Sequence, residues 1–509
     1  MIRDAGKPLR PAADHPCRPK RATMTFHSFQ YLVFLPVVVA LHFALPHRFR
    51  WMLLLASSYL FYAAWRADFL FLLILSTVTD YAVGLRMEAA RTQSARRAIL
   101  GVSLLVNLGL LFVFKYTSAL WDVAGQIATG LFAADPADFT HFDIILPLGI
   151  SFYTFQTLSY TIDIYRGRIR AERHLGYFAL YVAFFPQLLA GPIERAGHLL
   201  NELRTSRRFD WRWVGPSYFL IVLGLAKKLV IADRLARILA PIVQDPLHFS
   251  PLAVLLTPAA TVYQYYCDLS GYADIALGSA MLLGVRLSRN FDRPFAASST
   301  MRFWYRWHIT VTAWFRDYLL RSLVKGGSVA ASRPLALMIT GLVIGLWHGP
   351  TLGWAIAGCS VGLLAIPESR WARWRIRNAI GPRTALQRFL WEWAGRLYVW
   401  TVVFFLIGMP LTWGDLGMLT RVLEHIATLR LDDILMLLAV PAAQSYTVPI
   451  VILAIIALEI WQWLDAHGWA GRIIDALWLE VRWLSATAFA IGVLILADLS
   501  QSGFLYFKF

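Results

Sequence analysis

One histidine stands out in this sequence as a side chain able to do acid–base chemistry. His348 ends a long apolar run, next to Trp347, and a Gly-Pro break follows it. An imidazole changes its protonation near neutral pH, so it can take a proton from a hydroxyl group as a general base. A histidine in a helix bundle can equally be a hydrogen-bond partner of a neighbouring helix. The residues alone leave both interpretations open.

Polar and aromatic residues are densest between residues 264 and 321. This stretch contains Asp268, Asp274, Asn290, Arg306 and His308. Ionisable groups inside a membrane are costly and usually mark a functional path. For residues 301–317 a second interpretation is an amphipathic helix at the membrane interface, with its arginines on lipid phosphates. The two aspartates lie in a less interfacial context, which favours a functional role for them.

Glycine spacing explains two further patterns. Gly341, Gly345 and Gly349 are four residues apart, so they share one helix face and permit close packing. The run Gly358-Cys-Ser360-Val-Gly362 matches the G-x-S-x-G pattern of serine hydrolases. That pattern forms a nucleophile only at a strand-to-helix turn, whereas this copy lies in a continuous apolar run. We therefore do not expect Ser360 to be catalytic.

Sequence signatures of bound cofactors and metals are missing from the chain. It has no P-loop, no H-E-x-x-H and no G-x-G-x-x-G that opens a helix. Its three cysteines, Cys17, Cys267 and Cys359, give no regular framework for disulfides or zinc. We expect no metal site and no tightly bound cofactor.

The composition is that of a membrane protein. Of 509 residues, 58% are hydrophobic and only 16% are charged. A soluble domain is about half apolar and has about a quarter of its residues charged. The net charge of +17 fits basic cytoplasmic loops that face anionic lipid, so we expect no nucleic-acid partner.

Apolar runs of membrane-spanning length recur along the whole chain. They predict an all-α polytopic integral membrane protein with roughly 10–13 membrane segments, some of them re-entrant. No linker separates two domains, so residues 24–509 are expected to form a single membrane-embedded domain. Residues 1–23 are basic and proline-rich, and Met24 is a second plausible start. They are expected to be a disordered tail or a mis-called start.

Loop charges predict part of the topology. The loops 85–97 and 166–173 each carry four arginines, whereas 117–143 has no lysine or arginine. The first two are expected to face the cytoplasm and the third the opposite side. Residues 175–194 lie between two basic loops and contain Pro186, Gly191 and Pro192. A re-entrant hairpin would keep both of these loops on one side.

Many ordered motifs resemble the membrane-bound O-acyltransferase family, in its bacterial alginate O-acetyltransferase branch. The similarity runs from about Met24 to the C-terminus. The motifs are Leu60-Phe-Tyr-Ala-Ala-Trp65, Leu146-Pro-Leu-Gly-Ile-Ser-Phe-Tyr-Thr-Phe-Gln156, Phe185-Pro-Gln-Leu-Leu-Ala-Gly191-Pro192, Lys227-Lys228 with Ile231-Ala-Asp233, Ser270-Gly-Tyr-Ala-Asp274, Asn290-Phe-Asp-Arg-Pro294, Phe303-Trp-Tyr-Arg-Trp-His308, Gly345-Leu-Trp-His-Gly349 and Phe504-Leu-Tyr-Phe-Lys-Phe509.

The resemblance implies a fold, a reaction and a site. The fold is a ring of helices around a funnel, in a bacterial inner membrane. An acyl group, most simply acetyl, would pass from a cytoplasmic thioester such as acetyl-CoA to an extracytoplasmic polysaccharide, such as alginate or another exopolysaccharide. His348 corresponds to the near-invariant family histidine, and His308 to a second one typical of the branch. We expect Asp268, Asp274, Asn290, Arg306 and Trp347 to contact the donor or substrate.

The resemblance also implies partners. Relatives of this kind work with a periplasmic or membrane-anchored protein of the serine esterase type. Two alternatives stay open: D-alanyl transfer from a carrier protein to teichoic acid, and a transporter of polymers or lipids. Broken helices with polar residues at mid-membrane also occur in transporters. Transporters usually show paired repeats, however, and the histidine-bearing segments have no second copy.

Overall fold

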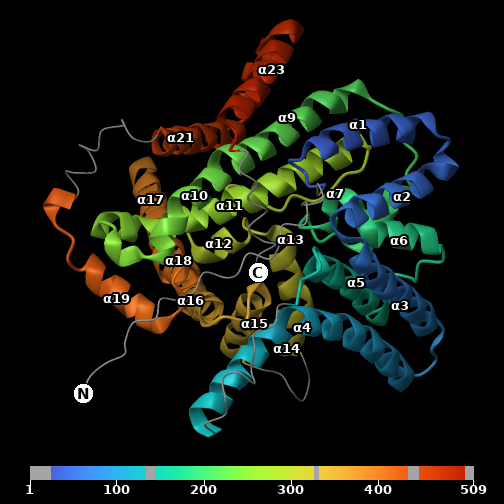
Figure 1. Cartoon of the computed structure of the whole chain (residues 1–509), viewed down its shortest axis with the longest axis horizontal. Helices are drawn as coiled ribbons and strands as arrows, with labels where there is room; N and C mark the ends of the chain where they lie inside the picture. The colour runs from blue at the N-terminus through green and yellow to red at the C-terminus, as the bar shows by residue number, and fades with distance from the viewer. Residues whose placement is uncertain (1–23, 133–143, 326–331, 434–445, 499–509) are drawn as a thin grey trace, which may run out of the picture.

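The computed structural model describes residues 24–132, 144–325, 332–433 and 446–498. Within these residues the secondary structure is helical and contains no strand, which confirms the all-α prediction. The tail 1–23 and the aromatic C-terminal motif 504–509 lie outside the described residues. Figure 1 shows long helices stacked side by side, with the N-terminal helices at one end of the molecule and α17 to α19 at the other.

The N-terminal helices bundle together and bury aromatic side chains such as Phe61, Tyr62 and Tyr160. They are α1 (Phe29–Ala44), α2 (His47–Arg66), α3 (Leu70–Ala89), α4 (Gln93–Phe132) and α5 (Ile150–Tyr165). Of these, α5 is the most enclosed, with most of its side chains buried, polar ones included. Protein therefore surrounds α5 on most sides.

The middle of the chain is built around α11, the long helix at the centre of Figure 1. Its elements are α6 (Leu175–Ala183), α7 (Phe185–Leu188), α8 (Ala196–Arg204), α9 (Val214–Leu225), the π-helical η4 (Ala226–Ala232), α10 (Asp233–Gln244), α11 (Pro251–Leu282), α12 (Thr300–Trp304), α13 (Ile309–Trp314), the π-helical η7 (Phe315–Leu320) and α14 (Arg321–Lys325). Short 3-10 turns lie here at η3 (Trp211–Trp213), η5 (Pro246–His248) and η6 (Pro294–Ala296), and η1 (Ala67–Phe69) joins α2 to α3 in the N-terminal bundle.

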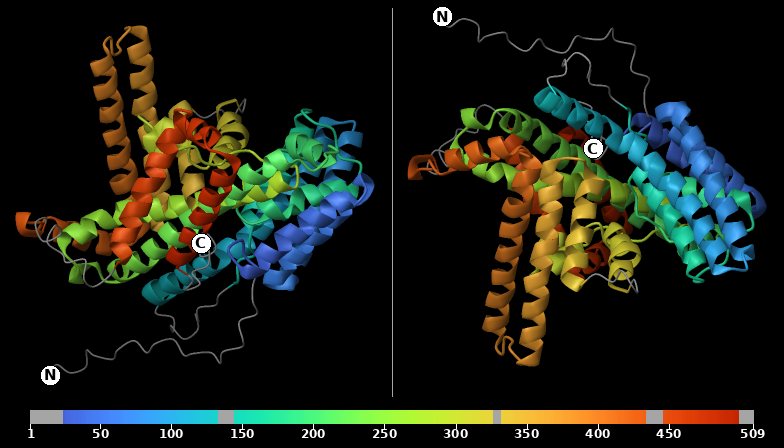
Figure 2. Two further views of the ribbon diagram at one scale, coloured as in Figure 1. Left: turned by 90° about the horizontal axis from the view of Figure 1, so that it is seen from above. Right: turned by 90° about the horizontal axis from the view of Figure 1, so that it is seen from below.

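The C-terminal part contains a helical hairpin, α16 and α17, which projects from the body in both views of Figure 2. Its elements are α15 (Arg333–His348), α16 (Leu352–Arg377), α17 (Ala385–Thr401), the π-helical η9 (Val402–Ile407), α18 (Gly408–Thr412), α19 (Leu416–Ile426), α21 (Thr447–Ala466), α22 (Trp469–Ala476) and α23 (Leu479–Leu496).

Helices able to cross a membrane occur throughout the chain. Among the described residues, seven helical stretches are long and apolar enough, and the first of them contains both α2 and α3. Two shorter apolar helices, α1 and α15, add to these. The prediction of a polytopic membrane protein is confirmed, and the exact number of segments stays a prediction.

The predicted loop 117–143 is wrong in its first half, because α4 continues to Phe132. Residues 117–132 contain no proline, so the helix meets no break. The absence of lysine and arginine indicated the side of the membrane, not the end of the helix. Residues 133–143 lie outside the described part of the chain.

The two ends of segment 175–194 lie on the same face of the protein. Arg204 forms an ion pair with Glu172 across the segment. Between these ends the helix breaks at Phe184, and the non-helical residues 189–194 are buried. Non-helical backbone within a membrane is tolerated where protein surrounds it. The contact brings the two basic loops together, as a re-entrant hairpin would, and the side of the membrane on which they lie stays a prediction.

The loop 85–97 joins the same face. Arg173 pairs with Glu88 at 2.9 Å, and Arg96 donates to the carbonyl oxygen of Ile164 at 2.9 Å. We call the surface formed by residues 85–97, 166–173 and 195–212 the basic face.

The glycine pattern is explained by the packing of α15 on α16. A Cβ atom at Gly345 would overlap the carbonyl oxygen of Trp354, and one at Gly341 the carbonyl oxygen of Gly358. The glycines of the G-x-S-x-G run are thus the partner half of this contact. Ser360 lies inside α16 and donates to the carbonyl oxygen of Ile356 at 2.8 Å. Its run is not a strand-to-helix turn, so it is no nucleophile elbow.

Replacing Gly345 with alanine should destabilise the protein, because the added methyl group must push α16 away from α15. Overpacking typically costs about 1–3 kcal/mol. The melting temperature in detergent should fall, whereas Gly101→Ala in α4, where the methyl group meets no neighbour, should leave it equal or higher. Equal melting temperatures for wild type and Gly345→Ala would contradict this packing.

Candidate active site

His348 sits at the C-terminal end of α15, as the sequence predicts. The chain then turns back at Gly349, so that Trp354 of α16 stacks on the imidazole, with ring centroids 4.6 Å apart and planes 13° apart. Trp347 lies against the same ring edge-on at 4.6 Å. His348 as a whole residue is half-buried. The two tryptophans hold its ring in place.

His308 immediately precedes α13 and has an unusual backbone conformation. Its φ angle of 47° lies in the left-handed region, where residues other than glycine are uncommon. Its side chain is only 3% exposed. Strained backbone of this kind persists only where the surroundings fix it, and it clusters at functional sites. The backbone contact from the Ile309 amide to the Asn290 carbonyl, 2.9 Å, is part of what fixes it.

The two imidazoles lie close together although 40 positions of sequence separate them. Their ring centroids are 6.5 Å apart. The end of α15 supplies one ring and the turn before α13 supplies the other. Two imidazoles at this separation can act on one bound group from two sides.

Asn290 belongs to the same site, through contacts with protein groups. Its Oδ1 accepts from the backbone N–H and the hydroxyl of Thr310, at 3.1 and 2.9 Å. Its Nδ2 lies 3.3 Å from Nδ1 of His308. The Asn290 side chain therefore fixes the orientation of the His308 ring.

Aromatic rings line the interior next to the two histidines. Trp347 is buried and stacks on Phe155 at 5.2 Å, and Phe155 stacks on Trp314 at 4.2 Å. The ammonium group of Lys115 lies 5.7 Å from the centroid of the Trp347 ring. Sequence reasoning overlooked Lys115, although a lone lysine within an apolar run was the available signal.

The two predicted aspartates of α11 are engaged by lysines of η4. Lys228 binds Asp268 at 2.6 Å and Asp233 at 2.9 Å, and Lys227 binds Asp274 at 2.6 Å. Buried charges need such partners, because burying an unpaired charge costs far more. The ion pairs join α11 to the π-helical turn, and this is the role that the structure shows for both carboxylates.

Arg306 lies after α12, in the connection that joins Asn290 to His308. Its Nη1 is 3.5 Å from the carbonyl oxygen of Arg293, and its own carbonyl accepts from the Asp292 N–H at 2.9 Å. These contacts close the turn that carries both site residues.

Glu194 anchors the buried segment beside this turn. Its carboxylate accepts from the hydroxyl of Ser288 at 3.2 Å and contacts His198 at 2.8 Å. The hydrogen bond to Glu194 raises the pKa of His198, which lies on the basic face. These contacts hold segment 189–194 against the irregular connection 285–289, which leads to Asn290.

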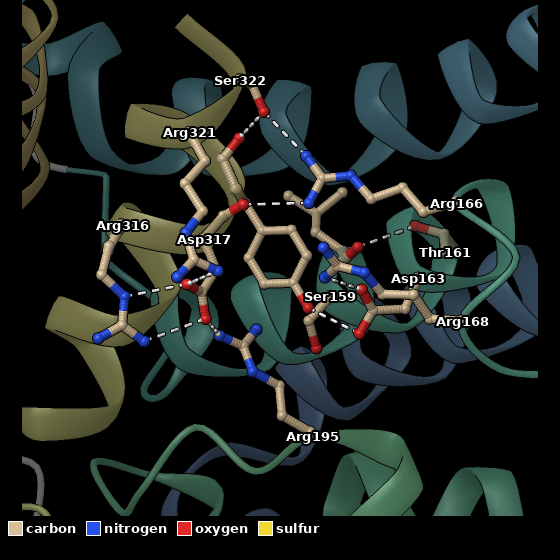
Figure 3. A network of polar contacts seen from close by, with 12 residues as sticks. Ser159, Thr161, Asp163, Arg166, Arg168, Arg195, Arg316, Asp317, Arg321 and Ser322 are labelled. Atoms are coloured by element: carbon tan, nitrogen blue, oxygen red, sulfur yellow. Dashed lines mark hydrogen bonds and ion pairs between the residues drawn. The ribbon is translucent and has the colours of Figure 1, made fainter. Parts of the chain in front are cut away.

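Five arginines gather on the basic face at the far end of α13 and η7 (Figure 3). We call Arg166, Arg168, Arg195, Arg316 and Arg321 the arginine cluster. Asp317 contacts Arg316 and Arg321 at 3.0 Å and Arg195 at 3.7 Å. Asp163 contacts Arg168 at 3.0 Å and accepts from the Tyr318 hydroxyl at 2.8 Å. Two carboxylates among five guanidinium groups leave an excess of positive charge.

The helix α13–η7 connects this cluster to His308. Asp317 lies nine positions after His308, which corresponds to about 14 Å along a helix. Trp314 and Phe315 lie between them and pack against Phe155. A long molecule could therefore have its anionic end on the basic face and its other end between the histidines.

The sequence is similar to known proteins of one family. The membrane-bound O-acyltransferase family model matches residues 170–409, which include both histidines. A probable alginate O-acetylase of Pseudomonas putida is 38% identical over 373 residues, 72% of this chain and 73% of the relative. A peptidoglycan O-acetyltransferase of Helicobacter pylori is 31% identical over 331 residues, 59% of this chain and 60% of the relative.

A probable alginate O-acetylase of Azotobacter vinelandii is 41% identical over 343 residues, 66% of this chain. The match spans 66% of that relative's length, just under two thirds. The chain thus belongs to the membrane-bound O-acyltransferase family, in its alginate O-acetyltransferase-like branch.

Proposed function

We propose that this protein transfers an acetyl group from a thioester donor to a hydroxyl acceptor, with His348 as general base. The observation that carries the proposal is the pairing of His348 with His308, 6.5 Å apart, beside the packed aromatic rings of Trp347 and Phe155. His348 takes the proton of the acceptor hydroxyl as its oxygen attacks the thioester carbonyl. The C–O bond forms, the C–S bond breaks, and the proton passes to the departing sulfur.

The arginine cluster is proposed to hold the phosphates of the donor, acetyl-CoA. One guanidinium group can bind two phosphate oxygens at once, through two charge-assisted hydrogen bonds. The flexible arm of coenzyme A would follow α13–η7 for about 14 Å and bring the thioester to the histidines. Trp314, Phe155 and Trp347 would exclude water along that path.

The basic face is proposed to be cytoplasmic, in a bacterial inner membrane, because cytoplasmic loops carry the excess of arginine and lysine. The acetyl group would then reach an extracytoplasmic polysaccharide, such as alginate or another exopolysaccharide. Relatives of 41% and 31% identity are named as alginate and peptidoglycan acetylating enzymes, whereas a teichoic acid D-alanyltransferase of Streptococcus thermophilus is 28% identical over 245 residues. The higher identity supports the proposal of acetyl over D-alanyl. A transporter would translocate its substrate without breaking the thioester, so thioester cleavage distinguishes the two classes.

Replacing His348 with alanine should reduce acetyl transfer by about 10²-fold or more, because the acceptor hydroxyl loses its base. Turnover of acetyl-CoA by purified protein in liposomes measures this, with membrane abundance checked. Ser360→Ala is the matched control in the neighbouring helix and should keep nearly full activity. Near-normal turnover by His348→Ala would refute the role of general base.

Replacing Arg195 with glutamine should raise KM for acetyl-CoA about tenfold and change kcat less, because one charge-assisted bond to phosphate is lost. Arg66→Gln is the control, since Arg66 pairs with Asp68 at the opposite end of α2 from the basic face. With acetyl-pantetheine, which has no phosphates, Arg195→Gln and wild type should have equal KM. A KM defect on both donors would argue against phosphate binding.

Polymer modification is proposed to need a second protein of the serine esterase type, periplasmic or membrane-anchored. The stretch predicted to face away from the cytoplasm, 117–143, is short, and its residues up to Phe132 belong to α4. Independent domains below about 40 residues usually need disulfides or metals. The purified chain should therefore hydrolyse or exchange its donor but acetylate polysaccharide poorly. Liposomes with acetyl-CoA and polymer, with and without the candidate partner, test this. Efficient polymer acetylation by the chain alone would show that no partner is needed.

A further inference from the structure

His308 is held by a chain of hydrogen bonds that starts in the buried segment 189–194. The backbone N–H of Ile193 donates to the hydroxyl oxygen of Thr310 at 3.0 Å. That hydroxyl lies 2.9 Å from Oδ1 of Asn290, and Asn290 Nδ2 lies 3.3 Å from Nδ1 of His308. Three of the residues in this hydrogen-bond series, Ile193, Asn290 and His308, are at most 3% exposed, and Thr310 is 9% exposed. Water therefore does not compete for these hydrogen bonds.

The direction of each bond follows from the one before. The backbone N–H of Thr310 can only donate, and it points at one amide atom of Asn290 from 3.1 Å. That atom must therefore be the oxygen, which also takes the Thr310 hydroxyl proton. The other amide atom is the NH2 group, which has protons and no acceptor capacity.

The proton position on His308 follows in turn. Because Asn290 Nδ2 donates, Nδ1 of His308 must accept through its lone pair. A neutral imidazole with a free lone pair at Nδ1 carries its proton at Nε2. An imidazolium would direct its Nδ1–H at the Asn290 NH2 group, so the site disfavours protonation of His308. Within the described residues, Nε2 is buried and has no hydrogen-bond partner.

We propose that His308 acts as a fixed hydrogen-bond donor, and that Asn290 is the positioning residue that sets its tautomer. The proposal rests on the proposed acyl transfer and gives its two histidines different tasks. The acceptor oxygen attacks the thioester carbon while its proton passes to His348. Negative charge develops on the carbonyl oxygen, which accepts the Nε2–H bond of His308. When the C–S bond breaks, the electron pair leaves with sulfur, which takes the proton from His348, and His308 keeps its own proton throughout.

This assignment excludes His308 as a second base or proton carrier. A base needs a free lone pair toward the substrate, and here the lone pair of His308 is occupied by Asn290. Donors placed in advance where charge develops are effective because they need no reorganisation during the reaction. The strained φ of 47° at His308 aims the ring in this way.

Substitutions at His308 separate a donor from a base. Glutamine places an amide N–H near the position of Nε2 but has no basic nitrogen. We expect His308→Gln to keep acetyl-CoA turnover within about tenfold of wild type, and His308→Ala to lose about 10²–10³-fold, as for removal of an oxyanion donor. His467→Gln, at an exposed histidine, controls for the substitution itself. If His308→Gln is stable but as inactive as His308→Ala while wild type turns over, the donor role is wrong.

A measurement of the tautomer needs no activity and so does not depend on the proposed reaction. In protein with ¹⁵N-labelled histidine, the His308 signals are identified by their loss in His308→Gln. We expect a protonated Nε2 and an unprotonated Nδ1. Asn290→Asp should move the proton to Nδ1, because the carboxylate accepts where the amide donated, and Asn201→Asp in α8 should move nothing. A proton on Nδ1 of wild-type His308 would overturn the proposal. Wild-type protein that does not cleave acetyl-CoA, with the expected tautomer, would refute only the proposed function.

Discussion

A polar group buried in this apolar protein has to find its partner within the protein, and the architecture depends on that constraint. Asp80 on α3 is fully buried and accepts from Ser103 and Asn107 on α4 at 2.5 and 2.8 Å. Lys228 is enclosed between Asp233 and Asp268 in the same way. Leaving any of these groups unpaired would cost more than the pair contributes, so the pairs fix which helices are neighbours.

The active site applies the same constraint to catalysis. The left-handed turn at His308 and the broken helix before Ile193 both leave backbone groups that must be satisfied. Asn290 and Thr310 satisfy them and, in doing so, order the protons around His308. One helical element, α13–η7, then begins at this turn and reaches Asp317 in the arginine cluster, with Trp314 and Phe315 between them. The proposed donor site and the candidate active site are thus separated in space and joined by one helical element.

Several features could be predicted because they depend on local chemistry. His348 ends its helix because Gly349 and Pro350 follow it. Glycines four residues apart had to pack against another helix, and α16 supplies the matching glycines. The arginines on both sides of segment 175–194 required its ends to share a face, and Arg204 contacts Glu172 accordingly. In contrast, charge gave the wrong extent for the loop after Tyr116, since an uncharged stretch can continue as helix.

The sequence by itself determined the membrane environment, the family and the two histidines, because composition, charge and ordered motifs are properties of the chain alone. Only the tertiary structure decided which groups meet. It paired Asp268 and Asp274 with lysines 40 and 47 positions earlier, and it made Asn290 the partner of His308. Such pairings depend on distances and bond directions between distant segments. Residue types do not predict these pairings, because a buried donor can be satisfied by any acceptor that the fold brings within reach.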